Sequence, residues 1–356
     1  MNIPELVISG PDSIASSIPY VIGFTPANSL VVMWLRDGCV RLTMRLDLPP
    51  SQAAPDDWVD AVMPYRSSSD EVIVCIVLSA RDSARDIGGE LHSQGLMSML
   101  LARLAETDCR VRDALLVSAD RWWSYLCDEP ECCPLAGTPI DPEIAKEVAA
   151  RFALAGVARL PDREAVIALC AADPARQLAV RHDLREARRA RSERLAAGGD
   201  GPGEFEAWRD ESISAVGRWL MGEVEVGSLA PAQILLALSD VRVRDTVLWD
   251  LANSQEHDAH RAFDRAAAVL RAAPSGAVAP IGSVTALLGW LIGDGVRAVA
   301  ALDRVTEDDP AYTLAELLGR SIGAGLSPVS WLEMMRDLGR DACRGGRPAQ
   351  QAIAAP

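Results

Sequence analysis

Three neighbouring cysteines are the residues of this chain best suited to chemistry: Cys127, Cys132 and Cys133, with three acidic residues between them. Thiolates and carboxylates are zinc ligands, and a structural zinc site needs four ligands. The spacing is not that of a zinc finger, no histidine lies nearby in the sequence, and adjacent cysteines seldom reach one ion together. We therefore expect no metal here and interpret the segment as a structural turn, with one thiol buried as a small hydrophobe. A redox pair is an alternative, although the Cys-x-x-Cys arrangement is missing.

Four aromatic residues form a candidate binding surface: Tyr20, Phe24, Trp123 and Tyr125. Trp122 and Trp123 are adjacent in an expected strand, so their side chains must point to opposite faces of a sheet. Tyr125 shares the face of Trp123. Large aromatic side chains are mostly buried, so packing in the core is favoured over a binding surface for these residues.

Other chemical motifs are weak or absent. His257 and His260 are spaced for a shared metal on an expected helix, but their neighbours are polar, which favours a solvated helix face. Residues 181–194 form the one basic concentration, yet acidic residues alternate with the arginines and no aromatic residue is interleaved for base stacking. The single lysine, Lys146, does not follow a glycine-rich loop, and neither a Gly-x-Ser-x-Gly nor a His-Glu-x-x-His motif occurs. No catalytic motif is recognised, so the sequence leaves open whether the protein is an enzyme.

Composition limits the class of protein. Lys and Arg number 35 against 50 Asp and Glu, giving a net charge of −15, which opposes general binding to nucleic acid or to anionic membrane. No apolar run approaches the roughly 18 residues of a membrane helix. Eight cysteines without a secretory signal at the start favour reduced thiols and a cytoplasmic location. We expect no cofactor.

The elements that position these residues fall into two parts, as a chain of 356 residues suggests. Residues 1–140 predict an α/β domain, a mixed five-stranded sheet with a parallel centre, antiparallel edges and flanking helices. A helix over 11–20 is expected to end at Gly23 in a left-handed cap, with Phe24 turned inward. Asp37-Gly38 predicts a hairpin turn. The expected strands cover 29–36, 39–46, 71–78, 111–117 and 121–127, with further helices over 56–65 and 83–106.

Residues 141–345 predict an all-helical domain, and residues 346–356 an unstructured tail. Near residues 281–318, Gly293, Ala298, Leu302 and Pro310 are spaced like the second helix of a tetratricopeptide repeat. An ordinary helical bundle explains the pattern equally well. The expected helices cover 141–155, 161–171, 174–196, 204–222, 230–239, 242–253, 256–272, 281–292, 295–306, 311–324 and 328–339.

Several segments together resemble a known family. The stretch from Ile18 to Val32, the run Arg121 to Cys127 and the triplet Cys132-Cys133-Pro134 are similar to an actinobacterial family catalogued as domain of unknown function 4192. The similarity extends from residue 11 to about residue 339. It implies an α/β N-terminal part and a helical C-terminal part, and it implies no catalytic residue.

Two hypotheses of function follow. The first is a cytoplasmic protein-interaction or regulatory module that uses its helical half, because helical repeats expose grooves for peptides or helices. Its partner would be a protein, not nucleic acid or membrane. The alternative is an enzyme or small-molecule sensor with a site between the sheet and the helical domain, near Tyr20, Phe24, Trp123 and Tyr125.

Overall fold

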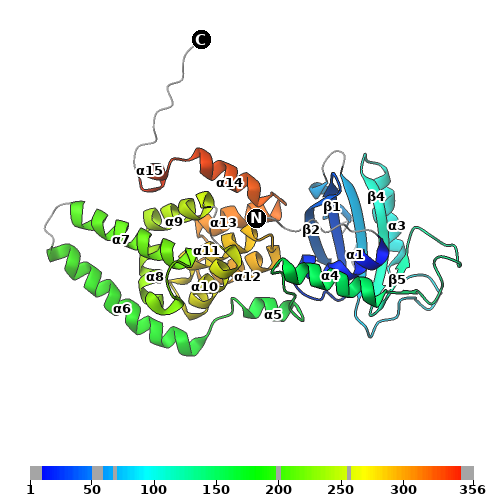
Figure 1. The fold of residues 1–356 in the computed structure, drawn as a ribbon, viewed down its shortest axis with the longest axis horizontal. Coiled ribbons are helices and arrows are strands. Elements are labelled where there is room, and N and C mark those ends of the chain that lie inside the picture. The colour runs from blue at the N-terminus through cyan, green and yellow to red at the C-terminus, as the bar shows by residue number, and fades with distance from the viewer. Residues whose placement is uncertain (1–9, 50–58, 67–69, 198–201, 255–257, 346–356) are drawn as a thin grey trace, which may run out of the picture. The chain divides into compact units, whose positions relative to one another are not determined.

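A computed structural model describes residues 10–49, 59–66, 70–197, 202–254 and 258–345, and the chain divides into two units (Figure 1). Unit 1 is Met1–Ala165 and unit 2 is Val166–Pro356. The division falls later than the expected boundary at residue 140. The reason is that helix α4 (Pro142–Leu154) packs on helix α1 (Pro11–Ile22), where the rings of Tyr20 and Phe152 stack with centroids 4.7 Å apart.

Unit 1 is built on a mixed sheet of six strands in the order β2-β1-β3-β4-β5-β6. The central pair β3 and β4 is parallel and every other pair is antiparallel, which confirms the expected parallel centre with antiparallel edges. A five-stranded sheet was expected; the sixth strand is only two residues long, too short to leave a pattern in the sequence. The strands are β1 Ser29–Arg36, β2 Cys39–Asp47, β3 Glu71–Leu78, β4 Arg110–Ser118, β5 Arg121–Ser124 and β6 Thr138–Pro139.

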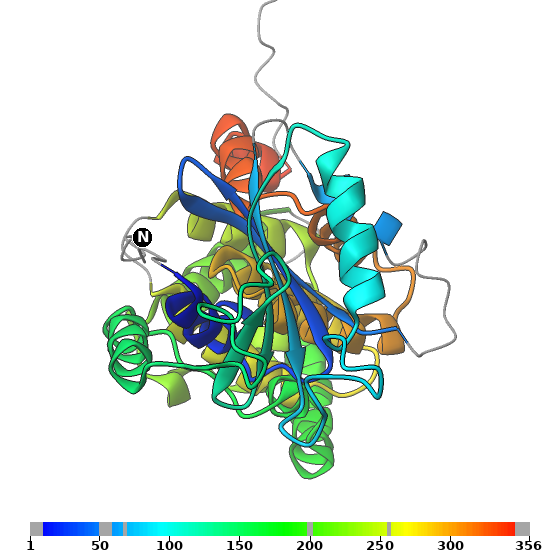
Figure 2. The same ribbon diagram turned by 90° about the vertical axis from the view of Figure 1, so that its right-hand side faces the viewer.

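Helices cover both faces of this sheet. In Figure 2, α1 lies on one side and α3 (Gln94–Ala105) on the other. Met97, Leu100 and Leu104 of α3 are buried in a core that they share with the sheet. A helix was expected over residues 83–106, but α3 begins only at Gln94, so the prediction is wrong in its first half. Residues 83–93 form a loop instead, because Gly89 has a φ of 85° and the Asp86 carboxylate accepts a hydrogen bond from the Glu90 N–H.

The predicted turns of unit 1 are confirmed. Gly23 caps α1 with a φ of 86°, and Phe24 beside it is 2% exposed. Asp37 and Gly38 have φ angles of 53° and 80°, as the two central residues of a type I′ hairpin require. The helix expected over 56–65 begins outside the described residues, and its described part ends in a short 3-10 turn, Met63–Tyr65.

Unit 2 is helical, and its described residues contain no strand, as expected. Helix α5 (Arg163–Ala168) spans the division between the units. Within residues 258–345, one helix, α15, follows the last helix that the sequence predicted. The remaining helices are α6 Pro174–Ala197, α7 Pro202–Met221, α8 Pro231–Leu238, α9 Val241–Asn253, α10 Ala259–Ala272, α11 Val278–Leu291, α12 Gly295–Asp308, α13 Thr313–Gly323, α14 Pro328–Asp337 and α15 Arg340–Cys343.

The core of unit 2 is centred on α11, whose residues are buried almost throughout and which packs most closely on α12 and α10. A Cβ atom on Gly289 would lie 2.8 Å from the backbone nitrogen of Ala298 in α12, so only glycine permits this approach. Ala298 and Leu302 are both buried. The four-residue spacing of small Ala298 and large Leu302 is thus explained by the packing of α12 against α11. That these helices form true repeats stays a prediction.

Candidate functional site

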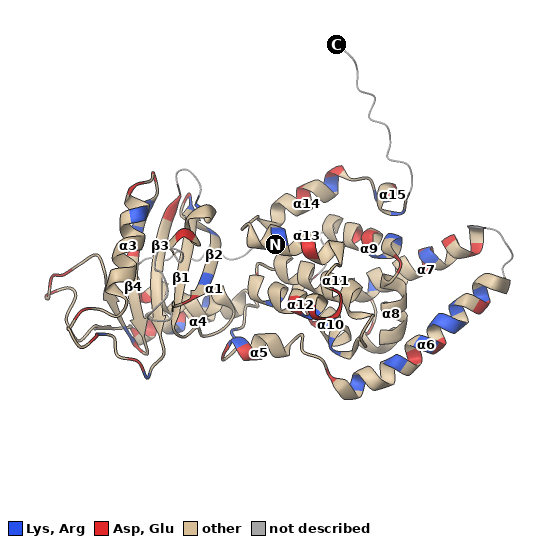
Figure 3. Cartoon of the chain, turned by 180° about the vertical axis from the view of Figure 1, so that it is seen from behind, with Lys and Arg blue, Asp and Glu red and all other residues tan. Residues whose placement is uncertain are grey.

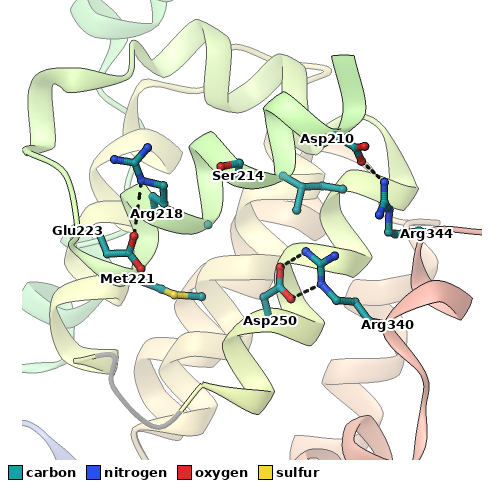
Figure 4. Close-up of a pocket in the computed structure, with 10 residues that line it drawn as sticks. Asp210, Ser214, Arg218, Met221, Glu223, Asp250, Arg340 and Arg344 are labelled. Atoms are coloured by element: carbon teal, nitrogen blue, oxygen red, sulfur yellow. Dashed lines mark hydrogen bonds and ion pairs between the residues drawn. The ribbon is translucent and has the colours of Figure 1, made fainter. Parts of the chain in front are cut away.

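The helical unit contains a pocket of about 320 Å³ bordered by α7, α9 and α15 (Figure 4). Six of its residues come from α7, and one, Asp250, comes from α9. Arg340 opens α15 and Arg344 directly follows it. The full lining is Asp210, Ile213, Ser214, Gly217, Arg218, Met221, Glu223, Asp250, Arg340 and Arg344.

Two arginines fix one wall of the pocket. Arg340 donates from Nε and Nη2 to the two carboxylate oxygens of Asp250, at 2.6 and 2.8 Å, which is the planar fork geometry particular to arginine. Arg344 donates to the carboxylate of Asp210 on α7. The Trp249 indole N–H also donates to the carbonyl of Leu338, just before α15, at 2.6 Å. These contacts hold the C-terminal helix against α7 and α9.

The opposite part of the pocket is apolar with one further ion pair. Ile213 is buried and Met221 is partly buried against the core, while Arg218 and Glu223 approach to 3.6 Å. The described lining residues include no histidine or cysteine, and each lining carboxylate faces an arginine. Such a site suits recognition of charge and shape better than proton transfer or nucleophilic attack.

The four aromatic residues predicted as a binding surface do not converge. The indole of Trp122 donates to Asp12 of α1 at 3.2 Å, so Trp123 and Tyr125 face the α3 side of the sheet. Tyr125 is 9% exposed, and its hydroxyl donates to a backbone carbonyl. Tyr20 and Phe24 belong to the α1 side of the sheet. Each aromatic ring therefore has a packing role within unit 1.

The three cysteines do converge. The sulfur atoms of Cys127, Cys132 and Cys133 all lie within 4.8 Å of one another, and Sγ of Cys127 is 3.1 Å from Sγ of Cys132. A turn produces this arrangement, because the carbonyl of Glu129 accepts the N–H groups of both Cys132, at 3.2 Å, and Cys133, at 2.8 Å. The predicted turn is present, but none of the three thiols is buried, so the expectation that one packs as a small hydrophobe is wrong.

The sulfur atoms also influence one another's acidity. A hydrogen bond from the Cys132 thiol, together with one from the Glu129 N–H, lowers the pKa of Cys127 below its ordinary value. The pKa of Cys132 is raised because its proton is held in that same bond. Partial desolvation and the two neighbouring sulfurs raise the pKa of Cys133 to about 12. Cys127 is thus the first of the three to form a thiolate.

The remaining sequence candidates are the two histidines and the basic segment of α6. His260 is partly buried and lies near the Asp294 carboxylate, rather than on a fully solvated helix face. His257 falls outside the described residues, and the backbone N–H of His260 donates to the helix cap Asp258. Acidic and basic side chains alternate along α6 (Figure 3). Arg194 at its end pairs with Glu204 and Glu211 of α7 at 2.5 and 2.6 Å. Arg189 also pairs with Glu193 at 2.8 Å, so part of the basic segment is bound by carboxylates of its own unit.

Sequence reasoning missed Arg340 and Arg344. Their spacing of four residues after Gly339 places both on one face of a helical turn, which is a weak signal. Their acidic partners Asp210 and Asp250 stand on different helices far earlier in the chain. No local pattern connects such pairs.

The fold and these sites describe a mixed-sheet α/β unit followed by an all-helical unit. The chain belongs to the family described as Domain of unknown function (DUF4192), which matches residues 11–329 and confirms the resemblance seen in the sequence. No curated protein and no solved structure matches the chain. Among the described residues, no helix combines the length and the apolar character needed to cross a membrane.

Proposed function

We propose that the protein is an interaction module whose helical unit binds an arginine-bearing helical segment of a partner protein between α7 and α9. One observation carries the proposal: the chain's own helix α15 occupies this place through Arg340 and Arg344, held by Asp250 and Asp210. The occupant in the structure thereby indicates the chemistry of the partner.

The acidic pair sets a specific geometry. Arginines four residues apart lie on one face of a helix, about 6 Å apart along its axis at 1.5 Å per residue. Asp250 accepts two parallel hydrogen bonds, a geometry that lysine cannot supply. Beside them, Ile213 and Met221 offer apolar surface in a pocket of about 320 Å³, within the usual size of ligand sites. A partner helix longer than α15 has room there for an additional side chain.

The present occupant is weakly held. Helix α15 has only four residues, too few to be stable without tertiary contacts. The side chains of Arg340 and Asp250 are 39% and 20% exposed, and those of Arg344 and Asp210 are 33% and 54% exposed. Exposed ion pairs contribute about 0–1 kcal/mol each. A partner segment that offers the same charges can therefore replace α15.

The charge of the whole chain supports a basic partner. A net charge of −15 attracts an arginine-bearing segment at long range and raises its association rate. All eight cysteines are free thiols, which supports our proposal of a cytoplasmic location, where thiols stay reduced.

Fluorescence anisotropy with a labelled peptide that has the sequence of residues 338–345 tests the proposal. We expect the full-length R340A/R344A variant, in which α15 has lost both ion pairs, to bind this peptide more tightly than the wild type by up to about 30-fold. Adding D210N and D250N to that variant should reverse this gain and weaken binding by up to about 30-fold. The R336A variant removes an exposed arginine of α14 outside the pocket and should behave like the wild type.

A second peptide separates charge from geometry. With both arginines replaced by lysine, the peptide keeps its charge but loses the forked hydrogen bonds, so we expect its binding to weaken. Equal binding of the first peptide to all four proteins, or to none of them, contradicts the proposed function.

A further inference from the structure

Unit 1 contains a second candidate site, which is independent of the pocket bordered by α7, α9 and α15. We propose that Cys127, Cys132 and Cys133 together bind a zinc ion through their sulfur atoms and leave its fourth coordination position to water or to an external ligand. The carrying observation is the convergence of three exposed or partly exposed thiols at the end of the β5 strand.

The distances between the sulfur atoms suit this ion. A tetrahedral zinc with bonds of about 2.3 Å to sulfur separates its thiolates by about 3.8 Å. The observed separations range from 3.1 Å, between Cys127 and Cys132, up to at most 4.8 Å, and so bracket that value. Each pair of sulfur atoms is therefore within about 1 Å of the separation that a shared ion requires.

The loop supplies the geometry that spacing alone does not. Four residues separate Cys127 from Cys132, and paired zinc ligands are typically separated by about two to four residues. Only the direct adjacency of Cys132 and Cys133 is unusual for a zinc site. The Glu129 carbonyl turns Cys132 and Cys133 toward Cys127. The end of this loop is held at β5 by a separate contact, because Arg121 of β5 donates a hydrogen bond to the carbonyl of Gly137 at 2.8 Å. The three sulfur atoms are therefore brought together before any metal arrives.

Three other thiols of the chain are buried in the way that a packing role requires. Cys75, Cys109 and Cys170 are buried, and burial raises the pKa of each. The three clustered thiols are not buried, so hydrophobic packing does not account for them. An internal disulfide would use two of the sulfurs and give the third no role.

The fourth coordination position is open to solvent. Among the described residues, no histidine or carboxylate joins the three sulfur atoms within the same distance. Cys132 is exposed and its two partners are partly exposed, so a small molecule or a further thiol can reach the ion. Three protein ligands with one open position is the arrangement of zinc sites that bind an exchangeable ligand.

Cobalt titration of the reduced, metal-free, full-length protein tests the site. Co²⁺ in a tetrahedral thiolate site has intense visible bands, and Zn²⁺ displaces it. We expect a single equivalent of Co²⁺ to bind and be displaced by Zn²⁺, with release of thiol protons. Protein purified without chelator should contain stoichiometric zinc by elemental analysis.

Matched variants locate the metal. Cys132→Ser removes one exposed ligand and should weaken Zn²⁺ binding by more than about 100-fold. Cys39→Ser removes an exposed thiol elsewhere in unit 1 and should leave binding unchanged. Hydrogen exchange of the peptides of β1, β3 and β4 in each variant checks that unit 1 remains folded. The proposal is overturned if the reduced wild type shows no cobalt bands, if the bands persist in Cys132→Ser, or if oxidation reveals only a Cys127–Cys132 disulfide in a protein that binds no metal.

Discussion

Replacing Gly289 with alanine tests the closest helix contact in the core of unit 2. The added Cβ would lie 2.8 Å from the backbone nitrogen and 3.1 Å from Cα of Ala298. Both atoms belong to the backbone of α12, which cannot rotate away as a flexible side chain could. Helices α11 and α12 must therefore separate, and α11 is buried along almost its whole length.

The size of the effect follows from two opposing terms. The new contact is about 0.6 Å shorter than an ordinary van der Waals contact, and overpacking of this kind costs typically 1–3 kcal/mol. Alanine in a helix interior gains about 1 kcal/mol over glycine. Because a backbone shift is at the expensive end of the range, we expect a net loss of about 1–2 kcal/mol in the free energy of unfolding.

Gly319→Ala is the matched control. Gly319 lies within α13 on an exposed face, and its added Cβ would meet only Cδ1 of Leu302 at 3.9 Å, an ordinary contact. The gain in helix propensity then stands alone, so this variant should be more stable by up to about 1 kcal/mol. The two substitutions are chemically identical and should have opposite signs.

Urea unfolding followed by far-ultraviolet circular dichroism measures the difference, because unit 2 contributes most of the helix signal. We expect the midpoints of the two variants to move in opposite directions from the wild type. If Gly289→Ala is as stable as the wild type or more so while Gly319→Ala is stabilised, the close approach of α11 and α12 does not exist as described.

Three further predictions concern unit 1. Gly137→Ala should reduce the stability of unit 1 by about 2–4 kcal/mol, because its Cβ would lie 2.4 Å from the Trp123 ring at a φ of 77°. Gly38→Ala, at a φ of 80° with no atom within 4 Å, should cost only about 1 kcal/mol, and hydrogen exchange of unit 1 peptides measures both. In metal-free protein the lowered pKa of Cys127 keeps its thiolate form at lower pH, so iodoacetamide should modify it below the pH at which an ordinary thiol reacts. Peptide mass spectrometry measures this modification and should find the buried thiols unmodified. Asp70→Ala removes a carboxylate that is 1% exposed and bound to two arginines, and should cost about 2 kcal/mol, whereas Asp47→Ala, whose ion pair is 80% exposed on the carboxylate side, should change the unfolding midpoint little.

The fold could be predicted from the sequence where the signals are local. The continuous apolar run of β3, the Asp37-Gly38 turn and the helix starts at prolines are each set by neighbouring residues. The expected helices of unit 2 occur with small shifts at their ends. The failures are also physical: the two-residue strand β6 is too short for a pattern, and the helix expected from residue 83 does not begin until Gln94.

The candidate sites could be predicted only in part. The sequence singled out Cys127, Cys132 and Cys133 and predicted a turn there, but their spacing argued against a shared ion. The convergence of the three sulfur atoms depends on the backbone hydrogen bonds to Glu129, which residue types do not show. The pocket beside Asp210 was not foreseen at all, since its walls come from helices far apart in the sequence. Residue types show which groups can do chemistry, whereas tertiary contacts decide which of them meet.

The two proposed sites place different energetic demands on the fold. Zinc binding by the three thiolates is coupled to the folded loop that presents them, so a bound ion stabilises this loop while its fourth position stays open. The two arginine pairs that hold α15 contribute together at most about 2 kcal/mol, so they favour the occupied pocket by up to about 30-fold. A partner that needs the open groove loses affinity by that same factor, and anything that weakens the pairs restores it. The helical groove is thus the part of the molecule that salt, competing arginines or loss of Arg340 and Arg344 can switch, while the sheet unit holds its site constant.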